Sequence, residues 1–396
     1  MDLINIDISH ETVDVDPDSI RKYDNNNDHL SLKRALQTVI TATTKHDVDS
    51  SIYAPSHLLI PDNTWIYRII SPFCKLVPPV RRFAAKNHYG NFVIERETGK
   101  EVWETMPVYA RIGMHLLFFG KLEERVVEAS MVRELFASES RRQGKYFDSP
   151  HSTRNIPGFI KHYNINTEEL LEPDISKYET FNEFFYRKLK PGARVISEPD
   201  NDCVIVSAAD SRLNVYQNID LATKYWIKGK NFTVAGLLND EELAKEFNEG
   251  SIAIFRLAPQ DYHRFHSPVT GVVGSSSFVN GTYFTVNPMA INEDLDVFTE
   301  NVRSVMILHS SAPGSSKIAF VSIGALLVGS VRYTSKEGDK VIKGDELGYF
   351  AYGGSTIICL WQKGRVKFDE DLTSNSSQCL ETLVKVGMRI GVSITP

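Results

Sequence analysis

Residues 343–361, KGDELGYFAYGGSTIICLW, decide the fold prediction. They read as a Gly-Asp turn, a short strand, a Gly-Gly-Ser-Thr turn and a second, wholly apolar strand. An apolar run of this length between turn signals is typical of a strand buried on both faces. Residues 337–342, EGDKVI, add a second Gly-Asp turn just upstream. The stretch therefore predicts hairpins of a sandwich-like β domain.

The same texture extends over the C-terminal half of the chain. After about residue 200, short β-branched runs such as GSIAIFRL, SVMILHSS and KIAFVSIG alternate with Gly, Pro, Asn and Asp. Residues 31–196 show mostly helical spacing instead, and Thr180 with Glu183 forms a capping box for a helix that Pro191 and Gly192 would end. We predict an α+β fold with three parts: a disordered acidic segment (1–30), a helical N-terminal region (31–196) and a β-rich, sandwich-like catalytic domain (197–396) on which the helical region packs.

The distribution of charged residues limits which partners and which cellular compartment are expected. The net charge is −6, so no basic field attracts nucleic acid. Residues 1–20 are acidic and hold no Lys or Arg, which argues against a secretory or mitochondrial leader, and no apolar run is long enough to span a membrane. We expect a cytosolic protein, or a peripheral one on the cytoplasmic side of an internal membrane. Residues 65–86 carry five basic residues among aromatics, which suits an anionic bilayer or equally a helix pair packed on the core.

Three short segments hold residues that could carry chemistry. In the first, AYGGST at 351–356, either the glycines simply permit a hairpin, or Ser355 is a nucleophile placed against the carbonyl of Gly354. In the second, DYHRFHSP at 261–268, His263 and His266 could be core residues, or an acid and a base that titrate near pH 7. No third ligand with matching spacing accompanies them, so no metal is expected.

The third segment, SAADSR at 207–212, places Asp210 at the end of an apolar strand. A carboxylate there is often only a turn former. It can also hold a histidine in one tautomer and stabilise the imidazolium, as in serine triads. If the three segments converge, Asp210, a histidine and Ser355 would form such a set.

Together these segments resemble the phosphatidylserine decarboxylase family. The resemblance extends to YETFNEFFYRKLKPGARVI at 178–196, WIKGKNFTVAGLL at 226–238, GTYFTVNPMAI at 281–291 and VSIGALLVGSV at 321–331, and it covers residues from about 155 to the end. Many members read Leu-Gly-Ser-Thr where this chain has Gly353 before Gly354. The family that this chain resembles also includes members that read Gly-Gly-Ser, so the resemblance still implies self-cleavage.

The resemblance implies a proenzyme that cuts itself between Gly354 and Ser355 into a β chain (1–354) and an α chain (355–396). His266, oriented by Asp210, would activate Ser355, which becomes a covalent pyruvoyl cofactor. That group would form a Schiff base with phosphatidylserine, release CO₂ and leave phosphatidylethanolamine. His263 is the candidate proton donor, and the roles of the two histidines could be exchanged. The implied partners are phosphatidylserine in anionic membranes, the α and β chains for one another, and a second copy in a homodimer.

Three alternatives remain open at this point. A relative of the same fold could decarboxylate a free amino acid, such as an aromatic one. A serine hydrolase could use Asp210, His266 and Ser355 without cleavage, and a relative that does not process itself could only bind lipid. The last two predict an intact chain, so a denaturing gel separates them from the decarboxylases.

Overall fold

The computed structural model describes residues 90–105, 144–225, 227, 232–281, 297–313, 316–324, 331–351 and 355–395. The chain divides into two compact units, residues 1–91 with 103–129 and residues 92–102 with 130–396. Nearly all described residues belong to the second unit. The acidic segment 1–30, the basic aromatic segment 65–86, most of the region predicted to be helical, and Gly354 lie outside the described residues.

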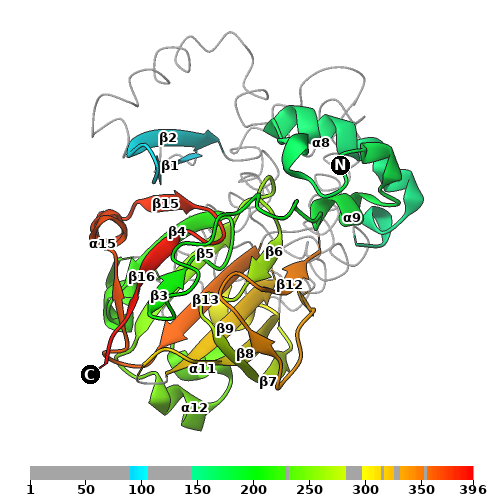
Figure 1. The fold of residues 1–396 in the computed structure, drawn as a ribbon. Coiled ribbons are helices and arrows are strands. Elements are labelled where there is room, and N and C mark those ends of the chain that lie inside the picture. Colours follow the sequence, from blue (N-terminus) through cyan, green and yellow to red (C-terminus); the bar gives the residue numbers. More distant parts are fainter. Residues whose placement is uncertain are drawn as a thin grey trace, which may run out of the picture. The chain divides into compact units, whose positions relative to one another are not determined.

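A ten-stranded sheet forms the main layer of the second unit (Figure 1). Its strands run in the order β11 (Lys340–Val341), β7 (Gly271–Val279), β8 (Arg303–Ser310), β9 (Lys317–Gly324), β13 (Ser355–Trp361), β5 (Ser251–Leu257), β4 (Ser211–Tyr216), β15 (Glu381–Val384), β1 (Gly90–Glu95) and β2 (Lys100–Thr105). Strand β13 lies at its centre, pairs antiparallel with β5 and β9 over all seven of its residues, and is buried throughout. The prediction of a buried strand at IICLW is confirmed.

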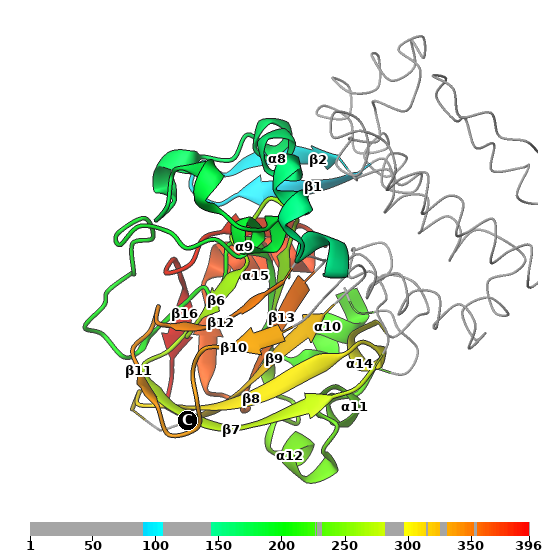
Figure 2. The same ribbon diagram turned by 90° about the vertical axis from the view of Figure 1, so that its right-hand side faces the viewer.

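Two small sheets complete the β-rich part. One contains β10 (Val331–Tyr333), β12 (Glu346–Phe350) and β6 (Arg264–His266), and the other contains β14 (Val366–Phe368), β16 (Arg389–Ser393) and β3 (Val204–Val206). The view turned by 90° shows the first of these, β6, β10 and β12, beside the long strands β7, β8 and β9 (Figure 2). The two Gly-Asp turns are present, with φ of +89° at Gly338 and +91° at Gly344, a conformation that glycine adopts without cost.

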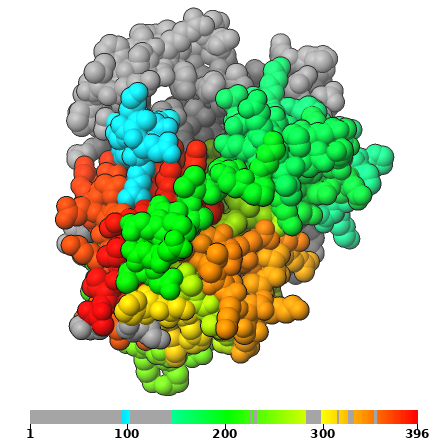
Figure 3. All heavy atoms as spheres, viewed as in Figure 1, coloured from blue at the N-terminus to red at the C-terminus, as the bar shows by residue number. Residues whose placement is uncertain are grey.

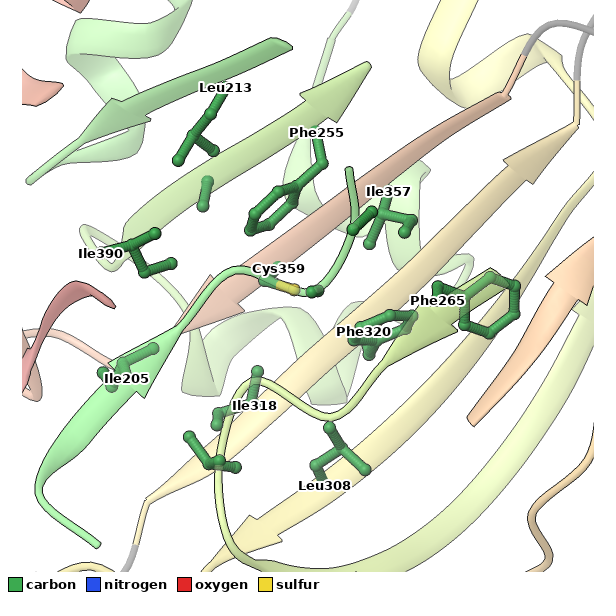
Figure 4. Close-up of a cluster of buried hydrophobic side chains, with 14 of the residues drawn as sticks. Ile205, Leu213, Phe255, Phe265, Leu308, Ile318, Phe320, Ile357, Cys359 and Ile390 are labelled. Atoms are coloured by element: carbon green, nitrogen blue, oxygen red, sulfur yellow. The ribbon is translucent and has the colours of Figure 1, made fainter. Parts of the chain in front are cut away.

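The core fills the space between the large sheet and both small ones. Phe255 and Ile357 of the large sheet, Phe265 of β6 and Ile390 of β16 belong to one buried cluster (Figure 4). Residues of β13 alternate between faces, so Ile357, Cys359 and Trp361 share this inner face. The arrangement confirms the predicted α+β class with a sandwich-like β domain. Figure 3 shows green, orange and red segments, far apart in sequence, side by side on one face.

The described helices are short. They are η2 (Pro150–Asn155), α8 (Ile156–Tyr163), η3 (Thr167–Glu169), η4 (Ile175–Lys177), α9 (Phe181–Phe185), α10 (Ile219–Tyr225), α11 (Val234–Leu238), α12 (Glu241–Glu246), α14 (Val297–Glu300) and α15 (Glu370–Ser377). Within the described residues, none of them has the length and apolar character that a bilayer crossing requires.

Helix α9 begins at the predicted cap and ends earlier than predicted. The Thr180 side chain accepts a hydrogen bond from the Glu183 backbone N–H at 3.1 Å, which satisfies one free donor of the first turn. The helix stops at Phe185 because the chain turns and pairs instead with an earlier segment through a bridge between Leu170 and Leu189. This early stop brings the residues that follow α9 toward the loop before β6.

A hairpin occupies residues 90–105, inside the region predicted to be helical. Strands β1 and β2 flank a tight turn in which the Gly99 N–H donates to the Glu95 carbonyl at 2.8 Å, with φ of +66° at Gly99. The sequence signal for it is the Glu-Thr-Gly turn between FVI and VW, a period of two that the helical interpretation overlooked. Strand β1 continues the large sheet through parallel pairing with β15.

Candidate active site

Ser355 is the first residue of β13 and is fully buried. Its register partners are Leu257 at the end of β5 and Gly324 at the end of β9. Because side chains alternate along a strand, Ser355 shares the inner face with Ile357. The hydroxyl therefore stands at the edge of the sandwich core, directly after the glycine pair.

The loop that carries His263 begins at a strand end next to Ser355. Residues 258–263 lead from β5 to β6, and residues 351–354 lead from β12 to β13. Leu257, just before the first of these connections, pairs with Ser355, and His263 at its end accepts a 2.9 Å hydrogen bond from the Phe350 N–H to its backbone carbonyl. The fold thus places Ser355 beside the first end of the loop 258–263 and His263 at its other end, although the two residues are 92 positions apart in sequence.

His263 is fully buried and neutral. Its Nδ1 lies 2.9 Å from the carbonyl oxygen of Asp261, which can only accept, so Nδ1 carries the proton and Nε2 a lone pair. Burial lowers the pKa of His263 to about 3, and the nearby positive charges of Arg187 and Arg212 act in the same direction. The Nε2 atom has no hydrogen-bond partner among the described groups. The ring lies against Phe185 of α9, with centroids 3.9 Å apart.

His266, at the end of β6, is oriented by two neighbours. Its Nδ1 lies 2.8 Å from the Gly344 carbonyl, and the Tyr262 hydroxyl lies 3.2 Å from its Nε2. The carbonyl again fixes the proton on Nδ1, so Tyr262 donates to the Nε2 lone pair. Burial lowers the pKa of His266, and the negative charges of Glu346 and Asp210 partly oppose this.

The carboxylate of Asp210 is held by an arginine. Arg194 places Nε 3.0 Å from each carboxylate oxygen and Nη2 2.6 Å from Oδ2, and the Val386 N–H adds a bond of 2.9 Å to Oδ1. The parallel donors of a guanidinium match a carboxylate better than a single imidazole N–H does. In this structure Asp210 therefore acts on His266 through its charge, and the expected hydrogen bond between them is not formed. The backbone N–H of His266 nevertheless donates to the Ala208 carbonyl at 2.8 Å. This bond holds the loop that contains Asp210 beside β6.

Three residues of the site escaped the sequence analysis. Arg194 also binds Glu169 at 2.8 Å, and these two carboxylates raise its pKa although burial alone would lower it. Tyr262 covers His266, and Arg187 reaches the loop before His263. Arg187 and Arg194 both lie in the stretch at 178–196 that carried the resemblance. The spacing of these two arginines was the sequence signal that could have identified them as site residues.

Ser355 and His263, both fully buried, offer a nucleophile and a proton acceptor away from bulk water. Both imidazoles are neutral, which is the form a general base requires; the Nε2 lone pair of His263 has no described partner, whereas that of His266 accepts from the Tyr262 hydroxyl. Among the described residues no cluster of His, Cys, Asp and Glu is arranged to hold a metal ion.

The fold and site define a class of protein: an α+β domain with a buried serine at the head of its central strand and a buried, neutral histidine in the loop that follows the neighbouring strand. The family model for phosphatidylserine decarboxylase matches residues 181–392, more than half of the chain. The chain belongs to the phosphatidylserine decarboxylase family.

Relatives from several kingdoms agree with this assignment. Phosphatidylserine decarboxylase proenzyme 3 of Schizosaccharomyces pombe is 49% identical over 304 residues, which are 77% of this chain and 31% of that protein. Proenzyme 2 of Oryza sativa is 45% identical over 76% of this chain and 48% of its own length. The proenzyme of Fusobacterium nucleatum is 38% identical over 75% of this chain and 96% of its own length. The chain thus spans half or less of these eukaryotic relatives and nearly all of the bacterial one.

Proposed function

We propose that this chain converts phosphatidylserine to phosphatidylethanolamine and CO₂, with a pyruvoyl group made from its own Ser355. The observation that carries the proposal is the place of Ser355, fully buried at the head of the central strand and directly after two glycines. Relatives that are 38–49% identical are named phosphatidylserine decarboxylase proenzymes, which supports a precursor that matures by cleavage.

The surroundings of Ser355 suit a pyruvoyl group. Strands β5 and β9 close both sides of β13 and keep out water that would compete for an electrophile. The lone pair of His263 Nε2, buried without a partner among the described groups, belongs to the loop next to this position. When formed, the pyruvoyl group supplies a ketone that captures the substrate amine and accepts electrons as CO₂ leaves.

The chain's own residues account for the self-cleavage. A neutral imidazole, for which we propose His266, takes the proton from the Ser355 hydroxyl, whose oxygen attacks the carbonyl carbon of Gly354. The Gly354–Ser355 C–N bond breaks, the amine keeps the returned proton, and an ester replaces the amide. Elimination frees the Gly354 carboxylate, and hydrolysis of the resulting dehydroalanine gives the ketone and ammonia. Asp210 contributes its charge, which favours the protonated form of His266.

His263 suits the proton transfer of the decarboxylation. With Nδ1–H committed to a carbonyl, Nε2 is the atom that accepts a proton and returns it to the substrate α-carbon. Burial keeps this imidazole in its neutral form, which is the form that accepts a proton. The exchange of roles with His266 is tested by comparing cleavage and turnover in the two His→Gln variants.

We also propose that the protein works at the surface of an anionic membrane on its cytoplasmic side. The substrate is a membrane lipid, and the basic aromatic segment 65–86 has the composition for such a surface. This segment lies outside the described residues, so the support comes from composition alone.

Mass and product analysis test the proposal together. The purified protein should run on a denaturing gel as fragments of about 40 kDa and about 5 kDa, in proportion to their shares of a 44.7 kDa chain. It should release CO₂ from phosphatidylserine vesicles and not from free aromatic amino acids. Ser355→Ala should stay intact and inactive, whereas Ser374→Ala, on the exposed part of α15, should be cut as usual. An uncut wild-type chain, or turnover of free amino acids alone, would refute the assignment.

A further inference from the structure

Arg187 is a buried cation with unusual partners. Its side chain is only 5% exposed. Nη1 donates to the Phe185 carbonyl at 3.3 Å, and Nη2 donates to the carbonyls of Gln260 and Asp261 at 3.1 and 3.3 Å. These bonds are long, and all three acceptors are neutral. The Nε atom has no hydrogen-bond partner among the described groups.

Carboxylates near Arg187 are already committed to other arginines. The charges of Asp210 and Asp261 favour its protonated form, yet the carboxylate of Asp210 is bonded to Arg194 and that of Asp261 to Arg212. Burial lowers the pKa of Arg187 to about 10, so the guanidinium still carries its charge near pH 7. Arg187 forms no ion pair with any described residue. Its partners are carbonyl oxygens and the Phe184 ring, 5.2 Å from Cζ. A buried charge without an ion-pair partner is costly, and a bound anion would lower this cost.

The second unpartnered atom of the site lies beside it. Arg187 Nη2 and His263 Nδ1 both donate to the carbonyl of Asp261, and the charge of Arg187 helps to lower the pKa of His263. Arg187 Nε and His263 Nε2 are therefore two buried polar atoms without described partners, on residues that meet at one carbonyl. Asp261 in turn accepts from the Ala258 N–H at 2.7 Å, one residue from the register partner of Ser355.

We propose that Arg187 is the anion-binding residue of the substrate site and receives the phosphodiester of the lipid head group beside His263. This inference rests on the proposed function, because it takes phosphatidylserine as the substrate. The guanidinium would use Nε–H and its incompletely bonded Nη groups, the donor geometry that matches phosphate oxygens.

The phosphodiester suits Arg187 better than the substrate carboxylate does. The carboxylate loses its charge as CO₂ leaves, so a fixed cation on it would stabilise the starting state more than the transition state. The phosphodiester keeps its charge throughout the reaction. A permanent cation there holds the substrate without opposing the chemistry.

Competition by two fragments of the substrate distinguishes these assignments. Glycerophosphoethanolamine has the phosphodiester and no carboxylate, whereas L-serine has the carboxylate and no phosphate. Inhibition of CO₂ release would be measured for wild type, Arg187→Lys, Arg187→Gln and the control Arg96→Lys, which alters a largely buried arginine bound to Asp369 and Asp371. Self-cleavage of each variant, read by mass, reports that it folds.

We expect the Arg187 variants to be cleaved, to raise KM for phosphatidylserine more than they lower kcat, and to weaken inhibition by glycerophosphoethanolamine at least tenfold. Inhibition by L-serine should be unchanged, and Arg96→Lys should match wild type. If the Arg187 variants weaken inhibition by L-serine alone, or leave inhibition by both fragments unchanged, the phosphodiester assignment is overturned. An uncleaved, inactive wild type would instead overturn the proposed function.

A crystal structure decides the matter if no Arg187 variant is cleaved. The processed wild-type enzyme would be soaked with glycerophosphoethanolamine. A phosphate oxygen within hydrogen-bond distance of Arg187 supports the proposal, and a phosphate bound elsewhere, or an adventitious additive only, refutes it.

Discussion

The two histidines make stability depend on pH in a defined window. In the folded chain burial lowers the pKa of His263 to about 3 and that of His266 below its usual range, whereas in the unfolded chain both return to about 6.5. Below pH 6.5 the unfolded chain therefore binds more protons, and the stability due to these groups, complete above that pH, is lost as the pH falls. For His263 the slope reaches about 1.4 kcal/mol per pH unit between these two pKa values.

Urea unfolding of the uncut Ser355→Ala chain at pH 7.5, 6.0 and 5.0 measures this effect. Adding His263→Gln should make the decline between pH 6.5 and 5.0 shallower by roughly one histidine's share. An unchanged slope would mean that His263 is accessible to protons in the folded chain.

Arg194 offers a second test at the residue scale. Arg194→Lys keeps the charge and loses the paired donors that fix Asp210, so the carboxylate can turn. We expect self-cleavage to slow roughly ten- to a hundredfold, as for other residues that orient a catalytic group. The rate of appearance of the large fragment measures it. Arg389→Lys, at a half-exposed ion pair with Asp369, is the matched control, and equal rates in both variants would refute the role.

The residue types of the site were predictable from sequence, and their hydrogen bonds were not. The loop of His263 begins at Leu257, the register partner of Ser355, and Asp210 directly precedes β4, which pairs with β5. The partner of Asp210 is Arg194, 16 positions upstream in a segment with no regular structure of its own. Local patterns predict strands and turns but not which of several cations reaches a buried carboxylate, since that depends on packing between distant segments.

At the scale of elements, α9 supports the site through its cap. Thr180→Ala should lower the free energy of unfolding by about 1 kcal/mol, because it leaves an N–H of the first turn unpaired. Helix α9 carries Phe185, which packs on His263, so cleavage should also slow. Chemical denaturation and the cleavage rate give both readings. Thr180→Ser keeps the hydroxyl and should restore them, and failure to do so would assign the loss to the methyl group.

The close approach of β12 to β6 predicts a larger effect. A Cβ on Gly348 would lie 2.3 Å from the Arg332 carbonyl oxygen and 2.6 Å from the Phe265 ring. Gly348→Ala should therefore cost more than about 2 kcal/mol by overpacking and should disturb the pairing that holds His266. Gly99→Ala is the control, because its Cβ meets nothing within 4 Å and costs only about 1 kcal/mol for the left-handed backbone. If Gly348→Ala and Gly99→Ala lower the free energy of unfolding by similar amounts in a denaturation experiment, the predicted clash is contradicted.

Some of the helices and strands were predictable from the sequence and others were not. The strands of the C-terminal half were found because tight turns separate runs of β-branched residues. The hairpin at 90–105 was missed because two short strands in a mostly helical context give a weak period of two. Helix α9 stopped short because the bridge between Leu170 and Leu189 overrides its local propensity.

At the scale of the whole molecule, the proposed cleavage should not separate the fragments. Residues 355–395 supply β13, β14, α15, β15 and β16, which pair with strands of the larger fragment in both the main sheet and a small one. Size-exclusion chromatography of the processed protein should give one species containing both fragments, and urea should release the small one. Two separate native peaks would contradict this.

The central position of β13 also sets an order of events during synthesis. Its neighbours β5 and β9 are translated first, and they cannot be joined until the chain beyond residue 355 has emerged from the ribosome. The last strand, β16, must then pair with β3, made nearly 200 residues earlier. A nascent chain therefore carries the proposed scissile bond in an unassembled state until the strands beyond residue 355 have emerged and paired.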